Sequence, residues 1–406
     1  MKMKILHINT LYGKGGAALL MQTLAKNIEQ NKDVEQFFIV KESSEAKADN
    51  ILQTRNLSSF FGYRKFFRII SEQVFLYRFL PLETHFILKK TREITPDIIH
   101  LHNIHGGYFQ TNILPKLSKI APIIWTFHDM FPITGHCTHS FECEKWETGC
   151  ENCERLDIYP SIKKDRTKFL WNYKNKVYNS ADFTIVTPSL WLKKCVEQSF
   201  LKNKDVRLIY NGIDSETFKK TDKTEARNEL GLPQDKKIVL FSANGGVKNP
   251  FKGGEFVFEA FEKLKNRKDV LFINIGGENN QTLENWLDFG YVSKPEIMAK
   301  LYSAADIYLF PTLADNCPLT AIESIACGLP VVTFETGGVP EIVENNKTGF
   351  VVGYKNGEML TSALEKLLDD DDLREKMTEN AVEASKKFSS KRMAIEYLKL
   401  YEELVK

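Results

Sequence analysis

The chain has 406 residues, of which 43% are hydrophobic and 27% charged, and its formal net charge is +2. This composition excludes disordered and collagen-like classes, and the length favours two domains over one core. No stretch approaches the roughly 20 apolar residues of a membrane-spanning helix, and residues 1–8 lack the long apolar run of a signal peptide. We therefore expect a cytoplasmic protein.

The charge is unevenly distributed along the chain. The first 200 residues carry 27 Lys and Arg against 20 Asp and Glu. A mildly basic first half suits phosphate groups or an anionic membrane surface, and ordinary solvated faces explain it equally well. No nucleic-acid partner is expected.

The first half of the chain alternates short apolar runs with helical patterns. Strands are predicted at 4–8, 98–102, 123–128 and 183–188, and a Gly-rich turn and a helix over about 17–29 follow the first of them. Apolar strands separated by helices are typical of a parallel sheet that is covered on both faces.

The same pattern restarts in the second half. Strands are predicted at 237–243, 270–276, 307–310 and 331–334, with helices between them. We therefore predict an α/β protein of two doubly wound Rossmann-like domains that face each other across a cleft. The predicted domains are 1–205, on which the C-terminal helix 388–406 packs back, and 206–387. Ligands of such sheets bind at the carboxyl ends of the strands.

Two loops after strands are rich in glycine. Gly13-Lys14-Gly15-Gly16 precedes the first helix, and Lys248-Asn249-Pro250-Phe251-Lys252-Gly253-Gly254 precedes a helix of the second half. Glycines let the backbone approach a ligand closely, and a helix start attracts phosphate. Neither loop has the dinucleotide or P-loop spacing. A structural turn and a surface lysine are the alternative interpretations.

The segment from Pro311 to Val332 contains the strongest motif. A strand ends at Pro311, a loop carries Asp315, a helix opens near Pro318, and Glu323 lies about one turn into it. Carboxylates at such a helix start can accept hydrogen bonds from sugar hydroxyls while the helix N-terminus receives a diphosphate. The structural alternatives are a helix cap for Asp315 and a buried ion pair for Glu323.

Asp315-x7-Glu323, followed by Ser-Ile-Ala-Cys-Gly-Leu-Pro-Val-Val, resembles the E-x7-E signature of retaining family 4 glycosyltransferases with the GT-B fold. The resemblance covers most of the chain. The other matching motifs, in the family's order, are residues 13–16, His128-Asp129, residues 210–214, Lys252-Gly253 and residues 337–343.

The resemblance implies a role for each matching residue. Glu323 would bind the ribose of a UDP- or GDP-sugar, and Asp315 would contact hydroxyls of the donor sugar. The diphosphate would be held by Gly15, Gly16, Lys252 and the backbone N–H groups of Leu319 and Thr320. His128 would lie near the donor sugar and the acceptor.

Two departures from the family pattern concern the donor. The first acidic residue is Asp315 instead of the commoner Glu, and Gly246 lies roughly where an Arg is common, so that Lys248 is its expected substitute. The resemblance implies retention of the anomeric configuration without a catalytic metal. The acceptor would be a saccharide or a lipid-linked sugar of bacterial surface polysaccharide synthesis.

Four cysteines crowd one short segment: Cys137, Cys143, Cys150 and Cys153. Four thiolates that include one C-x-x-C pair can hold a structural zinc, although the first two spacings are irregular. Unliganded thiols and an iron–sulfur cluster are the alternatives. Four ligands leave no open position, so the zinc would not be catalytic.

Basic and aromatic residues interleave at helical spacing over 60–79. A peripheral helix at the inner face of the membrane and an aromatic core helix both fit this pattern.

Two other functions stay open at this point. A sugar-nucleotide epimerase or hydrolase on the same fold would need an acid–base pair that faces the sugar. A non-catalytic partner subunit would bind through the cysteine segment, but the presence of both Asp315 and Glu323 counts against it.

Overall fold

The computed structural model describes residues 2–44, 48–54, 80–277 and 282–405. The chain forms two compact units, residues 1–210 with 391–406 and residues 211–390. The sequence placed these boundaries at 205/206 and 387/388. The basic aromatic stretch 60–79 lies outside the described residues.

The first unit is built on a seven-stranded sheet in the order β3-β2-β1-β4-β5-β6-β7, in which all the pairings are parallel. Its strands are β1 (Met3–Tyr12), β2 (Val34–Ser43), β3 (Ile51–Gln53), β4 (Ile98–Leu101), β5 (Ile123–Thr126), β6 (Thr184–Thr187) and β7 (Val206–Leu208). β4, β5 and β6 are buried at every position, as is usual for parallel strands covered on both faces.

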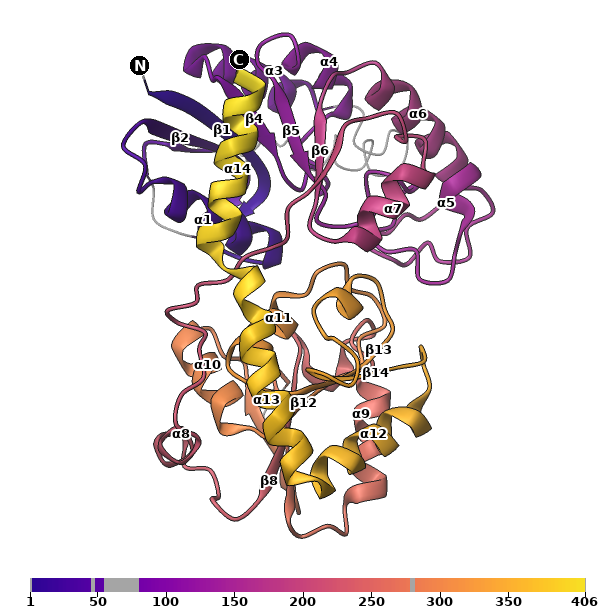
Figure 1. The fold of residues 1–406 in the computed structure, drawn as a ribbon. Helices are drawn as coiled ribbons and strands as arrows, with labels where there is room; N and C mark the ends of the chain where they lie inside the picture. Colours follow the sequence, from indigo (N-terminus) through magenta and orange to yellow (C-terminus); the bar gives the residue numbers. More distant parts are fainter. Residues whose placement is uncertain (1, 45–47, 55–79, 278–281, 406) are drawn as a thin grey trace. The chain divides into compact units, whose positions relative to one another are not determined.

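Helices cover both faces of this sheet. They are α1 (Gly16–Ile28), α3 (Pro81–Ile94), α4 (Leu114–Leu117), α5 (Lys145–Thr148), α6 (Thr167–Asn179), α7 (Leu190–Gln198) and α14 (Ser390–Val405). α14 is the yellow helix labelled in Figure 1, and its side chains contact β4 and β5. It presents two buried tyrosines, Tyr397 and Tyr401, to the sheet.

The second unit has its own seven-stranded sheet, in the order β10-β11-β9-β8-β12-β13-β14. The β10/β11 pair is antiparallel and the other pairs are parallel. The strands are β8 (Lys237–Ser242), β9 (Val270–Ile275), β10 (Thr282–Leu283), β11 (Trp286–Gly290), β12 (Ile307–Phe310), β13 (Val331–Phe334) and β14 (Gly349–Val352). The prediction of two Rossmann-like α/β domains is therefore confirmed.

The helices of the second unit include α8 (Lys223–Leu230), α9 (Gly254–Leu264), α10 (Pro295–Ala304), α11 (Leu319–Ala326), α12 (Gly357–Asp369) and α13 (Asp371–Ser385). In the described part of the chain, no helix has the length and apolar character needed to span a bilayer.

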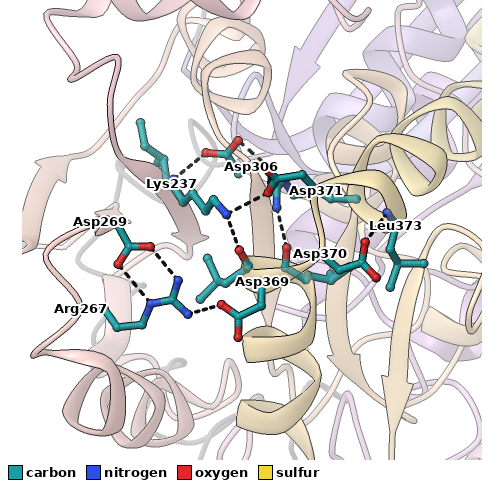
Figure 2. A network of polar contacts seen from close by, with 12 residues as sticks. Lys237, Arg267, Asp269, Asp306, Asp369, Asp370, Asp371 and Leu373 are labelled. Atoms are coloured by element: carbon teal, nitrogen blue, oxygen red, sulfur yellow. Dashed lines mark hydrogen bonds and ion pairs between the residues drawn. The ribbon is translucent and has the colours of Figure 1, made fainter.

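Charged side chains tie the amino ends of β8, β9 and β12 to the helices α12 and α13 (Figure 2). Lys237, the first residue of β8, pairs with Asp371, and Arg267 pairs with both Asp269 and Asp369. Asp306, which precedes β12, is buried and pairs with Arg227 at 2.7 Å. These contacts hold the amino ends of the strands. The loops that carry the candidate site residues follow the carboxyl ends of the same strands.

Candidate active site

The loop between β12 and α11 leads to a helix start without a side-chain cap. The N-cap residue is Pro318, no side chain caps the helix, and its first turn contains no acidic residue. Asp315 therefore does not cap α11, which removes one structural alternative for it. The first backbone N–H groups, those of Leu319 and Thr320, point along the helix dipole toward an anion position.

Glu323 lies one turn into α11 and has few polar partners. Its nearest one is the Tyr302 hydroxyl, which donates to Oε2 over a long 3.5 Å. Glu323 makes no ion pair with any residue of the described part of the chain, so the second structural alternative is also absent. Burial raises the pKa of Glu323 to about 7, because it disfavours the charged carboxylate.

Glu323 contacts the first of two neighbouring tyrosines, and the second tyrosine contacts a serine. Tyr302 lies on α10, and its ring packs edge-on against Tyr308 of β12. The Tyr308 hydroxyl lies 2.8 Å from Oγ of Ser242, the last residue of β8. The sequence did not single out these three residues, because nothing in their spacing distinguishes them from core residues.

Lys252 and Asp315, predicted to bind different parts of the donor, bind each other. Lys252 Nζ lies 2.6 Å from Asp315 Oδ2, and both side chains are mostly buried, with exposed fractions of 23% and 17%. The Thr312 hydroxyl donates to the same carboxylate oxygen at 2.5 Å. The loops after β8 and β12 are therefore joined at their charged side chains.

Close backbone approaches hold these loops in place. Gly253 has a φ of +63°, and a Cβ there would lie 2.0 Å from the Pro311 carbonyl oxygen. Gly337 has a φ of +52°, and a Cβ there would lie 1.9 Å from the Asp315 carbonyl oxygen. A side chain at either position would push apart the segments that carry Lys252 and Asp315.

Lys248 lies on the same loop as Lys252, in a short 3-10 turn, and is exposed. The structure thus brings together Lys252, Asp315, Leu319, Thr320 and Glu323, while Lys248 stands at the surface of the loop.

In the first unit, the turn between β1 and α1 is open. Gly15 has a φ of +88°, it and Gly16 are exposed, and a Cβ at either residue would meet no atom within 4 Å. α1 starts without a side-chain cap and without an acidic residue in its first turn. This geometry suits an anion.

His128 follows β5 at the carboxyl end of the first sheet and is partly buried. Its neighbour Asp129 accepts from the backbone N–H of Phe131 at 2.8 Å and lies 3.1 Å from Nε2 of His105. His128 also contacts His102, at 3.1 Å. Burial lowers the pKa of His128 to about 4.

The four clustered cysteines have free thiols and line one hollow of about 470 Å³, together with His136. Cys153 Sγ lies 3.7 Å from His136 Nε2. Among the described residues, however, His7, His100 and His102 form the one group of three or more potential ligands within 4.8 Å of one another. Tetrahedral zinc would need sulfurs about 4 Å apart. No three of the four cysteine sulfurs lie this close to one another, and the four-cysteine zinc site stays a prediction.

Family comparisons cover both units. Residues 14–217 match Glycosyltransferase Family 4, and residues 222–384 match Glycosyl transferases group 1. A putative colanic acid biosynthesis glycosyl transferase, WcaC of Escherichia coli K12, is 23% identical over 268 residues, which cover 63% of this chain and 64% of WcaC. The D-inositol 3-phosphate glycosyltransferase of Corynebacterium jeikeium is 30% identical over 252 residues, 57% and 59% of the two chains. The chain spans about half to two thirds of the length of such relatives.

Solved structures share the fold over nearly the whole chain. Sucrose-phosphate synthase from Thermosynechococcus elongatus has a TM-score of 0.74 at 17% identity, with 99% of each chain covered. Anabaena HepE in complex with UDP-glucose has a TM-score of 0.66 at 16% identity, with 99% of this chain and all of that chain covered. The chain belongs to glycosyltransferase family 4 and has the two Rossmann-like domains of the GT-B fold.

Proposed function

We propose that the protein transfers a sugar from a nucleoside diphosphate sugar to a saccharide or lipid-linked acceptor, with retention of the anomeric configuration. The proposal depends mainly on one observation. Glu323 is a half-buried carboxyl whose nearest polar partner is 3.5 Å away, and it lies one turn beyond an uncapped helix start. A carboxyl in this position is suited to accept hydrogen bonds from a ligand.

The nucleotide would bind along α11. In this proposal the ribose hydroxyls donate to Glu323, and the diphosphate accepts from the backbone N–H groups of Leu319 and Thr320. Lys252 then exchanges part of its contact with Asp315 for a phosphate oxygen. Gly15 and Gly16 would offer backbone contacts to phosphate, and exposed Lys248 would add positive charge.

The freed carboxylate of Asp315, held by Thr312, would accept from a hydroxyl of the donor sugar. The bond from the anomeric carbon to the diphosphate oxygen breaks, and Lys252 and the helix dipole stabilise the departing charge. The acceptor hydroxyl bonds to the same face of that carbon and passes its proton to the departing phosphate oxygen. This scheme needs neither a protein nucleophile nor a catalytic metal.

The comparisons support this class of donor and acceptor. HepE structures contain UDP or UDP-glucose, and WcaC is named for colanic acid biosynthesis. We propose a UDP- or GDP-sugar as donor and a role in bacterial surface polysaccharide synthesis on the cytoplasmic side of the membrane, with peripheral membrane contact for a lipid-linked acceptor.

We also keep a structural zinc as a proposal for the cysteine segment. The shared hollow and the 3.7 Å contact between Cys153 and His136 support it, and small shifts of the thiols would be needed to close the site. Purified protein with no bound metal, and with unchanged stability on chelator treatment, would end this proposal.

The test of the main proposal is a thermal-shift screen against nucleoside diphosphates and their sugars. A ligand at 100 times its Kd should stabilise the protein by about 2.7 kcal/mol. With the best donor, NMR of the product should show transfer with the anomeric configuration of the donor. Release of free sugar at the same rate in the absence of any acceptor would indicate a hydrolase instead.

A further inference from the structure

Four histidines lie together on the first sheet, and the transfer mechanism above uses none of them. His7 is on β1, His100 on β4, and His102 and His128 follow β4 and β5. His7, His100 and His102 are fully buried, and the rings of His102 and His128 stack 5.3 Å apart.

Three of these rings form a continuous hydrogen-bonded chain that ends on His128. His7 Nδ1 lies 3.2 Å from His102 Nε2, and His102 Nδ1 lies 3.1 Å from His128 Nε2. At the other end, His7 Nε2 lies 3.2 Å from Oε1 of Gln36 on β2. This row of hydrogen bonds therefore crosses the sheet from β2 to the carboxyl end of β5.

Gln36 fixes the direction of this chain. Its amide nitrogen donates to the carbonyl oxygen of Ala25 on α1 at 2.9 Å, so its oxygen must face His7. An amide oxygen accepts only, and His7 must donate from Nε2. His7 Nδ1 is then an acceptor, which requires a proton on Nε2 of His102. By the same step, His128 donates from Nε2 to His102.

Each of the three rings must carry one proton for this hydrogen-bond pattern to form. Burial lowers the pKa of His7 and His128 to about 4 and the pKa of His102 well below its ordinary value. All three rings are therefore neutral near pH 7, and each has one donor and one acceptor nitrogen.

A metal ion among His7, His100 and His102 is the competing explanation, because their nitrogens lie within 4.8 Å of one another. However, His100 Nδ1 lies 2.7 Å from the Tyr401 hydroxyl and His100 Nε2 lies 2.8 Å from the Thr126 hydroxyl. Both nitrogens of His100 are thus engaged by hydroxyls, and a metal would have to break one of these contacts. The hydrogen bonds described here are made without a metal.

We propose that Gln36, His7 and His102 are positioning residues that hold His128 in a single orientation as its Nε2–H tautomer. His128 then presents Nδ1 as an acceptor nitrogen. This inference rests on the proposed function and on the place that the family resemblance implies for His128, near the donor sugar and the acceptor. With the proton on Nε2, this imidazole can act only as an acceptor at Nδ1, and the opposite tautomer would place a donor there.

The tautomers of these histidines can be measured directly in the full-length protein. In protein labelled with ¹⁵N-histidine, long-range ¹H–¹⁵N correlation spectra distinguish an Nε2–H ring from an Nδ1–H ring. We expect His7, His102 and His128 all to be Nε2–H. An Nδ1–H signal for His128 in the unaltered protein would overturn the proposal, whether or not the protein transfers sugar.

Variants test the positioning role. Gln36→Met removes the acceptor at the start of the chain and should give a mixture of His128 tautomers, with kcat roughly tenfold lower and the KM for the donor little changed. Gln53→Met, the same substitution on neighbouring β3, is the control and should leave both unchanged. Gln36 is partly exposed, so this variant does not depend on refilling the core.

A second pair of variants distinguishes the effect of the hydrogen-bonded histidines from the effect of changing any buried histidine of the core. His102→Phe breaks the chain, whereas His100→Phe changes an equally buried histidine outside it. We expect only His102→Phe to change the His128 signal and lower kcat. Normal turnover in both Gln36→Met and His102→Phe, in a protein that Glu323→Ala inactivates, would refute the positioning role and leave the proposed function standing.

Discussion

The two ends of the second sheet differ in how their buried carboxylates are paired. At the amino ends, buried Asp306 pairs with Arg227 and Lys223 and accepts from the backbone N–H of Ile238, so its charge is compensated within the protein. At the carboxyl ends, Glu323 has one long contact to Tyr302 and a pKa raised to about 7.

This difference suggests that the amino ends of the strands serve stability and the carboxyl ends serve function. A buried charge that has all its partners contributes to a fixed structure, and removal of one partner is costly. A half-buried carboxyl with few partners costs free energy in the folded protein, and a ligand can supply what is missing. Changes at the amino ends should therefore lower stability, and changes at the carboxyl ends should lower activity.

Asp306→Ala should give the largest effect. It leaves the Arg227 guanidinium buried beside an empty position and should lower the free energy of unfolding by about 3–5 kcal/mol. Denaturant titration measures this loss. Asp235→Ala, at an exposed position just before β8, is the control. If the folded fraction of Asp306→Ala had lost its specific activity, the division between the two ends would be wrong.

Glu323→Ala should lower kcat/KM by about 100-fold, equivalent to about 2.7 kcal/mol. Its free energy of unfolding at pH 8 should not fall, because the removed carboxyl has few partners. Initial rates and thermal unfolding on the same preparation test both halves of this expectation. A large loss of stability with normal turnover would reverse our assignment of this end of the sheet.

Lys252→Met should lower kcat/KM roughly 30-fold, because the charge that opposes the departing diphosphate is lost. Steady-state kinetics with the identified donor measure this effect. Lys265→Met, beyond the far end of α9, is the matched control and should behave as the unaltered protein. Equal activities of the two variants would remove Lys252 from the site.

The stability of the protein should depend on pH through Glu323. Its pKa in the folded protein, about 7, is above the ordinary value of 4.5, so the folded state binds the proton more tightly. Stability from this group is present below about pH 4.5 and is lost as pH rises through 7. Relative to Glu323→Gln, the unaltered protein should lose on the order of 1 kcal/mol between pH 5 and pH 8 in denaturant titrations. Parallel curves for the two proteins would mean that Glu323 is ordinarily solvated.

Asp371→Asn should have the smallest effect. Asp371 pairs with Lys237 and Arg374, but its side chain is 70% exposed. Exposed ion pairs contribute little, so we expect a loss of about 0.5 kcal/mol in denaturant titration, less in high salt. A loss as large as that of Asp306→Ala would show that pairing alone, and not burial, sets the importance of charges at the amino ends.

The architecture was predictable because the parallel strands are short apolar runs. β4, β5 and β6 are buried at every position and stand out from the polar helices around them. β2 was not predicted, because only its three central residues are buried. Motif spacing also located the loop and helix that carry Asp315 and Glu323.

Contacts between distant residues were not predictable. Lys252 and Asp315 are 63 residues apart, and each was assigned to the ligand without the ion pair between them. Nothing in the sequence distinguishes Tyr302, Tyr308, His7 and His102 from other core residues. Only the fold brings the two tyrosines to Glu323 and connects the two histidines to His128. The four cysteines are close in sequence, but no three of their sulfurs lie within 4.8 Å of one another, so the zinc site stays a prediction.

The C-terminal helix has a consequence for the synthesis of the protein. Tyr401 of α14 reaches a buried histidine on β4 that precedes it by 301 residues, and Tyr397 reaches Thr126 of β5. A nascent chain emerging from the ribosome can pair the strands of its first sheet early. The contacts of this histidine and of Thr126 with the two tyrosines can form only after nearly 200 further residues, including the whole second unit, have been translated. The first unit begins to fold first and is completed last.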